Sequence, residues 1–205
     1  MKRINKVRME VERSMKIAIT GGIGSGKSYF SKILERKGVH VYDCDAAAKQ
    51  LMADNIALQK AICQLVGPDT YKNGILQKNV LAKYLLNNKE HRQALDNLVH
   101  PEVAFDFLHS GKDWLESAIF FDSGFDQRVK MDVVACVSAP VEVRIQRVMD
   151  RDRISREKAL QWIHSQLPQE EVERRSDLVI LNDGKHNLEK EVAHLLETLS
   201  RWPEN

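Results

Sequence analysis

The chain has 205 residues, which is long enough for one domain with a hydrophobic core and room for an inserted subdomain. Its formal net charge is only +2, so it has no broad basic surface of the kind that binds nucleic acid, and no apolar run is long enough to span a membrane. The three cysteines, Cys44, Cys63 and Cys136, are too widely spaced to indicate a zinc site or a disulfide framework. We therefore expect a cytoplasmic protein with no nucleic-acid or membrane partner.

Residues 1–14 precede the first predicted strand and are rich in charged side chains. No apolar stretch follows them, so they do not form a secretory signal. We expect a disordered N-terminal extension, or an upstream start ahead of Met15. A chain that begins at Met15 should therefore keep its stability and its function.

The first predicted strand, residues 16–20, leads into a glycine-rich loop that fits the phosphate-binding pattern G-x-x-x-x-G-K-[ST]. Glycines let successive backbone N–H groups turn inward on a phosphate chain, Lys27 adds a cation for the outer phosphates, and Ser28 offers a hydroxyl to Mg²⁺. A helix is predicted from Tyr29 to Lys37 and ends at Gly38. This strand, loop and helix predict a site for a nucleoside triphosphate with Mg²⁺. The candidate binding residues are Gly22, Ile23, Gly24, Ser25, Gly26, Lys27, Ser28 and Tyr29.

Two aspartates follow the second predicted strand, residues 39–42. In a parallel sheet the carboxyl ends of the strands share one rim, so Asp43 is expected beside the transferred phosphate. We interpret Asp43 as the general base for an acceptor hydroxyl, with Mg²⁺ binding through water as the alternative. Asp45 is expected to cap the helix 46–52.

Residues 56–110 show apolar residues at helical spacing and no strong strand signal. They predict a helical insertion between the second and third strands, suited to bind the acceptor. His100-Pro101 is expected to mark a helix boundary, and on its own His100 is more typical of a structural histidine.

A buried strand is predicted over residues 117–121, and it ends at Asp122. An acid in this place is a weak match to the aspartate that helps to hold Mg²⁺ in P-loop enzymes. Another strand is predicted over residues 132–138.

Three arginines share one face of the next predicted helix, which begins at Val141. We expect Arg147 and Arg151 to act on phosphate as planar bidentate donors, and Arg144 to lie in solvent. A lid helix over residues 155–166 and a polar segment over residues 169–176 follow, and such a lid could exclude water from phosphoryl transfer. A last strand, residues 178–181, leads to the turn at residues 182–184 and to an amphipathic final helix.

Strands that alternate with helices after a P-loop predict an α/β, P-loop NTPase-type three-layer fold with a central parallel sheet. An Asn-Lys-x-Asp base-reading segment, expected of a GTPase, is absent from the sequence, and a motor usually needs a longer chain. The carboxylate, the acceptor subdomain and the arginine lid favour a small-molecule kinase.

Several segments in this order resemble the dephospho-CoA kinase family. They are residues 19–28, the Asp43-x-Asp45 pair, His100-Pro101, Arg147-x-x-x-Arg151-Asp152, and Ser176-Asp177-x-Val179-Ile180 with Asn182. The resemblance implies transfer of the ATP γ-phosphate to the 3′-hydroxyl of dephospho-CoA, the last step of coenzyme A synthesis. Another small-molecule or nucleotide kinase, and a nucleotide-binding regulatory protein without turnover, stay open as alternatives.

The resemblance also implies a division of the chain and of its site. The predicted parts are a core of residues 15–55, 112–150 and 176–205, a helical acceptor subdomain over 56–111, and a lid over 151–175. Asp43, Lys27 and Arg151 would be catalytic, and Arg147 would bind the nucleotide. Asn182 and Gly184 would lie near the adenine, and His100 and Asp122 would contact the acceptor. We expect a monomer or a weak homo-oligomer.

Overall fold

The computed structural model describes residues 15–86 and 88–203, so the expectation for residues 1–14 lies outside the described part of the chain. The elements follow in this order: β1 (Ile17–Thr20), α1 (Lys27–Arg36), β2 (Val41–Asp43), α2 (Cys44–Asp54), α3 (Ile56–Val66), the 3₁₀ turn η1 (Pro68–Thr70), β3 (Tyr71–Lys72), β4 (Ile75–Leu76), α4 (Lys78–Leu85), α5 (Lys89–His109), β5 (Trp114–Glu116), α6 (Phe125–Arg128), β6 (Val133–Ser138), α7 (Val141–Asp152), α8 (Arg156–His164), α9 (Gln169–Arg174), β7 (Leu178–Leu181) and α10 (Leu188–Ser200).

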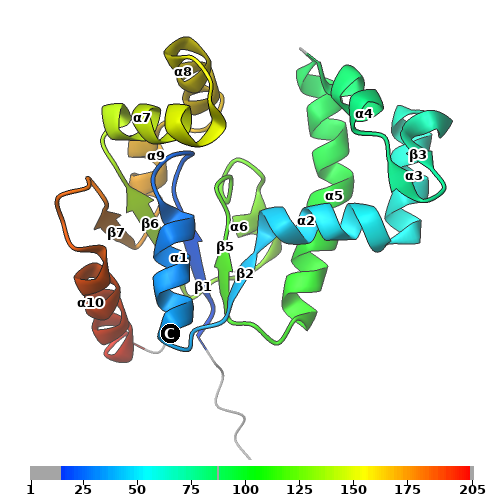
Figure 1. The fold of residues 1–205 in the computed structure, drawn as a ribbon. Helices are drawn as coiled ribbons and strands as arrows, with labels where there is room; N and C mark the ends of the chain where they lie inside the picture. Colours follow the sequence, from blue (N-terminus) through cyan, green and yellow to red (C-terminus); the bar gives the residue numbers. More distant parts are fainter. Residues whose placement is uncertain (1–14, 87, 204–205) are drawn as a thin grey trace, which may run out of the picture.

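The centre of the molecule is a five-stranded sheet with the order β2-β5-β1-β6-β7, in which every pair of neighbours is parallel (Figure 1). Strand β1 lies in the middle, because β5 joins one of its edges and β6 the other. The carboxyl ends of all five strands therefore meet at one rim, and the prediction of a central parallel sheet is confirmed.

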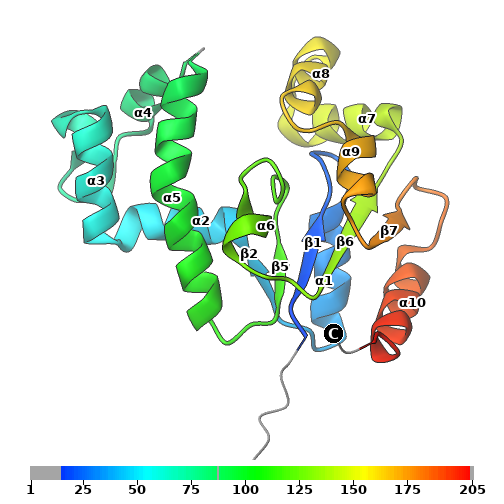
Figure 2. The same ribbon diagram turned by 180° about the vertical axis from the view of Figure 1, so that it is seen from behind.

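Helices cover both faces of the sheet, as the alternation of side chains along β1 requires. Ile17 and Ile19 pack with α1 and α10 on the face seen in Figure 1. Ala18 packs on the other face, where α5 and α6 lie in Figure 2. Two apolar cores separated by one sheet give the expected three layers.

The chain leaves the sheet after β2 and forms the helices α3, α4 and α5, which stand to one side of the sheet (Figure 1). The expectation that no strand interrupts this region was wrong, since β3 and β4 form a short antiparallel hairpin. Pro101 also lies inside α5 instead of at a helix boundary. A proline costs a helix about 3 kcal/mol, but α5 buries Val99 and Val103 on either side of it, and this packing holds the helix together.

The third strand of the sheet lies earlier in the sequence than the apolar run predicts. It is β5, and residues 118–124 form turns instead of a strand. Phe120 is buried there and packs against the rings of Phe121 and Phe125. An apolar run can be buried as a turn or as a strand, and here the turn buries Phe120 in a cluster of aromatic rings. The acid at the end of this strand is therefore Glu116 and not Asp122.

Helices α7 and α8 lie above the rim, on the opposite side from α3–α5 (Figure 1). They share a small apolar core formed by Ile145, Val148, Ala159 and Ile163. The polar segment predicted over residues 169–176 forms the short helix α9 over most of its length. No helix in residues 15–86 and 88–203 is long and apolar enough to cross a membrane.

Candidate active site

The glycine-rich loop connects β1 to α1 at the centre of the rim. Gly26 precedes α1 with φ of 91°, a left-handed conformation that glycine adopts at little cost. A Cβ atom at Gly26 would also lie 2.1 Å from Nδ2 of Asn182. Within the described residues, no protein acceptor receives the N–H groups of Gly24, Gly26, Lys27 and Ser28. Free N–H groups at the start of a helix attract anions, so this loop can hold a phosphate chain.

A serine and a glutamate from different elements meet beside this loop. The hydroxyl of Ser28, in the first turn of α1, donates to Oε1 of Glu116 at the end of β5, with 2.6 Å between the oxygens. Glu116 is only 8% exposed. Its carboxylate and the hydroxyl are oxygen ligands of the kind that Mg²⁺ prefers. The sequence analysis missed Glu116 because it placed the strand too late, and the turn at Gly111 was the signal that a strand could start earlier.

Asp43 ends β2 and lies opposite Glu116 in the register of the two strands. It also caps α2, since its Oδ1 accepts from the N–H of Ala46 at 2.9 Å. The expectation that Asp45 caps this helix was wrong, because α2 begins two residues earlier than predicted. Asp43 is exposed, and among the described residues no donor contacts its Oδ2. The helix therefore fixes one oxygen of this carboxylate, on a residue that ends a strand at the rim.

Electrostatics around Lys27 reflect this gathering of acids. Burial lowers the pKa of Lys27 most strongly, and the charge of Arg151 lowers it further. The carboxylates of Glu116, Asp45 and Asp43 act in the opposite direction. A buried cation with a lowered pKa gains most from an additional anion, and a phosphate chain on the loop would supply one.

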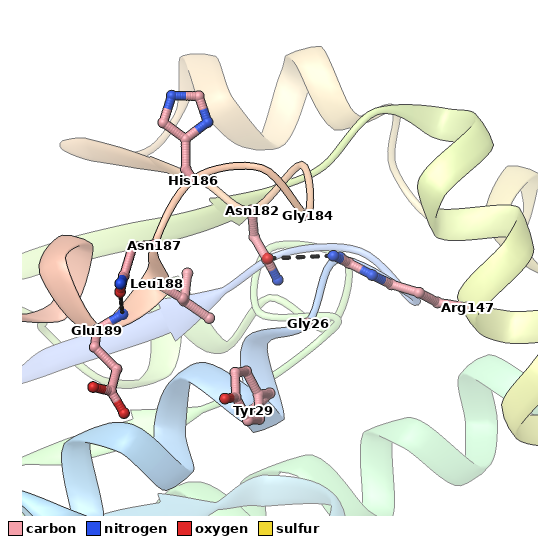
Figure 3. Close-up of a pocket in the computed structure, with 9 residues that line it drawn as sticks. All are labelled: Gly26, Tyr29, Arg147, Asn182, Gly184, His186, Asn187, Leu188 and Glu189. Atoms are coloured by element: carbon pink, nitrogen blue, oxygen red, sulfur yellow. Dashed lines mark hydrogen bonds between the residues drawn. The ribbon is translucent and has the colours of Figure 1, made fainter.

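A hollow of about 560 Å³ opens on the other side of the loop, toward β7 and α10 (Figure 3). Its lining residues are Gly26, Tyr29, Arg147, Asn182, Gly184, His186, Asn187, Leu188 and Glu189. Nη2 of Arg147 donates to Oδ1 of Asn182 at 3.3 Å, and Nη1 of Arg147 donates to the carbonyl oxygen of Ser25 at 3.2 Å. Nδ2 of Asn182 donates to the same carbonyl oxygen at 2.8 Å. The predicted nucleotide residues Tyr29, Arg147, Asn182 and Gly184 are thus brought together.

The other two arginines of α7 differ from their expected positions. Arg144 was expected in solvent, but it is 3% exposed, and its Nε donates to the carbonyl oxygen of Ile23 at 2.9 Å. The carbonyl groups of the loop offer acceptors that the sequence pattern alone does not locate. Arg151 is exposed and makes a two-pronged ion pair with Asp152 at 2.7–3.1 Å. Among the described residues, Arg151 makes no hydrogen bond to the glycine-rich loop.

The two predicted acceptor residues lie on different segments, but His100 makes a hydrogen bond with the backbone of Ser123, the residue that follows Asp122. His100 lies on α5, 3.6 Å from Oδ1 of Asp96, and burial lowers its pKa. Asp122 faces the segment after α8, where its Oδ1 accepts from the N–H of Leu167 at 2.8 Å. Burial raises the pKa of Asp122, although this hydrogen bond opposes the shift. Arg174 and Arg175 pair with Glu171 and Asp126 respectively.

Comparisons with known proteins identify relatives along most of the chain. A family model described as dephospho-CoA kinase matches residues 15–187. A dephospho-CoA kinase of Bacteroides fragilis is 40% identical over 91% of this chain and 93% of its own length, and one of Porphyromonas gingivalis is 37% identical over 89% and 93%.

Solved structures show the same similarity. The protein TT1252 from Thermus thermophilus is 31% identical, with a TM-score of 0.76 over 93% of this chain and 98% of its own. A dephospho-CoA kinase from Campylobacter jejuni is 25% identical, with a TM-score of 0.65 over 91% and 97%. A shikimate kinase from Acinetobacter baumannii, at 16% identity and a TM-score of 0.57 over 93% and 94%, shares the fold.

Proposed function

This chain belongs to the dephospho-CoA kinase family and is an ATP-dependent kinase. We propose that its two substrates bind on opposite sides of the glycine-rich loop, at the carboxyl edge of the sheet. The loop, α7 and β7 hold ATP, and β2, β5 and α5 receive dephospho-CoA. One observation carries this proposal. Asp43 and Glu116 end two paired strands beside the loop, and Glu116 is hydrogen-bonded to Ser28 of the P-loop.

On the ATP side, the four free N–H groups of the loop bind the phosphates, and Lys27 neutralises their outer oxygens. The hollow beside Arg147 and Asn182 is large enough for a purine base and ribose, and Gly184 and Tyr29 line it. Arg147 is already held by Ser25 and Asn182, so little side-chain entropy is lost when a nucleotide enters.

Residues on the rim also fit Mg²⁺. Ser28 and Glu116 supply oxygen ligands, and Mg²⁺ usually needs only one or two protein ligands besides phosphates and water. The described residues contain no group of three or more histidines, cysteines or acids that could hold a metal by themselves. When bound, Mg²⁺ neutralises charge on the β- and γ-phosphate oxygens.

On the acceptor side, Asp43 acts as the general base. Its Oδ2 takes the proton of the ribose 3′-hydroxyl while the new oxygen–phosphorus bond forms and the bond to ADP breaks. The hydrogen bond from Ala46 fixes the direction of this carboxylate. Residues 56–111 bind the rest of the acceptor, with His100 and Asp122 as candidate contacts, and Arg151 stabilises the transferring group when residues 151–175 close. A cytoplasmic enzyme, monomeric or weakly self-associated, stays our prediction.

An ADP-release assay with ATP, Mg²⁺ and a panel of acceptors tests this proposal. The panel contains dephospho-CoA, nucleoside monophosphates, pantetheine compounds and shikimate. We expect turnover with dephospho-CoA alone. Turnover with a nucleoside monophosphate would instead favour a nucleotide kinase, and ATP binding without any turnover would favour a regulatory protein.

A further inference from the structure

The junction between α8 and α9, residues 165–168, contacts the glycine-rich loop directly. Oε1 of Gln166 accepts from the N–H of Ile23 at 2.7 Å. On the other side of the same residue, Nε of Arg144 donates to the carbonyl oxygen of Ile23 at 2.9 Å. Both backbone polar groups of Ile23 are therefore bonded to side chains, one from α7 and one from the junction between α8 and α9.

The remainder of Ile23 is also held from that side. Its side chain packs against the small core between α7 and α8. A Cβ atom at the preceding residue, Gly22, would lie 2.3 Å from Nη2 of Arg144 and 3.3 Å from Oε1 of Gln166. The first half of the loop thus fits closely against the Arg144–Gln166 pair.

The junction that carries Gln166 is itself fixed to the core. The N–H of Leu167 donates to Oδ1 of Asp122 at 2.8 Å, which ties the junction to the turn after β5. Nη1 of Arg144 donates to Oε1 of Gln169 at 3.2 Å, which ties α9 to α7. Gln166 therefore reaches Ile23 from an anchored backbone and not from a loose loop.

We propose that Gln166 is a positioning residue for phosphate binding, which acts through the N–H of Ile23. This N–H is bonded to protein, whereas the N–H groups of Gly24, Gly26, Lys27 and Ser28 have no acceptor within the described residues. By fixing Ile23, Gln166 holds the loop in the shape that aims those four groups at a phosphate chain, so less conformational entropy is lost on binding. This inference rests on the proposed role of the loop in holding ATP.

A matched set of variants separates this role from a general structural one. Gln166→Met keeps the length of the side chain and removes the acceptor, whereas Gln166→Glu keeps an oxygen that accepts from Ile23. Gln161→Met is the control, because Gln161 lies on α8 and is exposed, and its side chain accepts only from Lys158 in the described structure. Each variant is measured for amide hydrogen exchange at Ile23, ADP affinity, KM for ATP, kcat and thermal stability.

In Gln166→Met we expect faster exchange at Ile23 and a loss of ADP affinity of roughly three- to tenfold, the amount that one neutral hydrogen bond contributes. KM for ATP should rise by a similar factor, with a smaller change in kcat. Gln166→Glu should keep the slow exchange at Ile23, and Gln161→Met should match the wild type throughout.

Three results would overturn the proposal: wild-type ADP affinity in Gln166→Met, unchanged exchange at Ile23 in that variant, or loss of protection in Gln166→Glu. The binding and exchange measurements need no acceptor. A wild-type protein that binds ADP but does not phosphorylate dephospho-CoA would therefore contradict the proposed function and leave this inference standing on its own measurements.

Discussion

The two sides of the P-loop differ in how far they are assembled before substrates arrive. On the nucleotide side, Arg144, Arg147, Gln166 and Asn182 all donate to or accept from backbone groups of the loop. On the acceptor side, Asp43 is exposed, and no donor in the described residues contacts its Oδ2. Arg151, near the end of α7, is likewise not bonded to the loop in the described structure and pairs with its own neighbour Asp152.

This difference follows from what each side must do. A phosphate chain is held by several N–H groups at once, and these bind it well only if the backbone is fixed beforehand. The acceptor side must first admit a large substrate and then exclude water, so part of it has to move after binding. We expect substitutions on the acceptor side to change kcat, and substitutions on the nucleotide side to change affinity.

The largest effect expected is that of Asp43→Asn, which should lower kcat by roughly 10²–10⁴-fold, the usual contribution of a general base. Asparagine caps a helix as well as aspartate does, so α2 should keep its start and the protein its stability. Affinity for ATP with Mg²⁺ should hardly change. Steady-state kinetics and a thermal melt check these expectations.

Asp45→Asn is the matched control for Asp43, because Asp45 is an exposed carboxylate two residues away and caps no helix. A kcat near that of the wild type in Asp43→Asn would refute the base assignment. A loss that high Mg²⁺ restores would instead make Asp43 a metal ligand.

Glu116→Gln should have the next largest effect. It tests Mg²⁺ binding at the place where the nucleotide side and the acceptor side meet. The amide oxygen can still accept from Ser28, but the charge that would attract Mg²⁺ is lost. We expect the Mg²⁺ concentration for half-maximal rate to rise by about 10–100-fold, as for other residues that support a metal.

Glu102→Gln is its control, since Glu102 also accepts from a neutral side chain, Nδ2 of Asn55. An unchanged Mg²⁺ dependence in Glu116→Gln would leave Glu116 with a purely structural role.

The smallest of the three effects is expected for Arg151→Lys. If Arg151 leaves Asp152 and acts on the transferring group, the loss of its planar fork should lower kcat by roughly tenfold, or about 1.4 kcal/mol of the barrier. KM for ATP should stay nearly constant.

Arg156→Lys serves as the control for Arg151, because Arg156 makes a comparable exposed pair with Glu142. Equal kcat values in the two variants would place Arg151 among the surface ion pairs.

Local sequence patterns were sufficient to predict the elements that carry a motif or a clear apolar run. The motif predicted β1, the loop and α1, and the apolar run over residues 178–181 gave β7 with its observed bounds. The resemblance to a family predicted that Asn182 and Gly184 lie near the adenine of ATP. Both residues line the hollow, and their contact with adenine stays a prediction.

Features that depend on tertiary contacts could not be predicted from local sequence patterns. Glu116 ends a three-residue strand, which is too short for a periodic pattern. Arg144 and Gln166 are ordinary surface residues by sequence, and only the position of α7 and of the α8–α9 junction beside the loop brings them to Ile23. Pro101 shows the opposite case, in which packing along α5 overrode a strong local signal.

Binding of a non-hydrolysable ATP analogue with Mg²⁺, measured by calorimetry with and without dephospho-CoA, tests the difference between the two sides most directly. A nucleotide side that is assembled in advance should bind the analogue without the acceptor, and dephospho-CoA should change its Kd by no more than about threefold, a coupling below the usual range for linked sites. Failure to bind the analogue until dephospho-CoA is added would contradict the account.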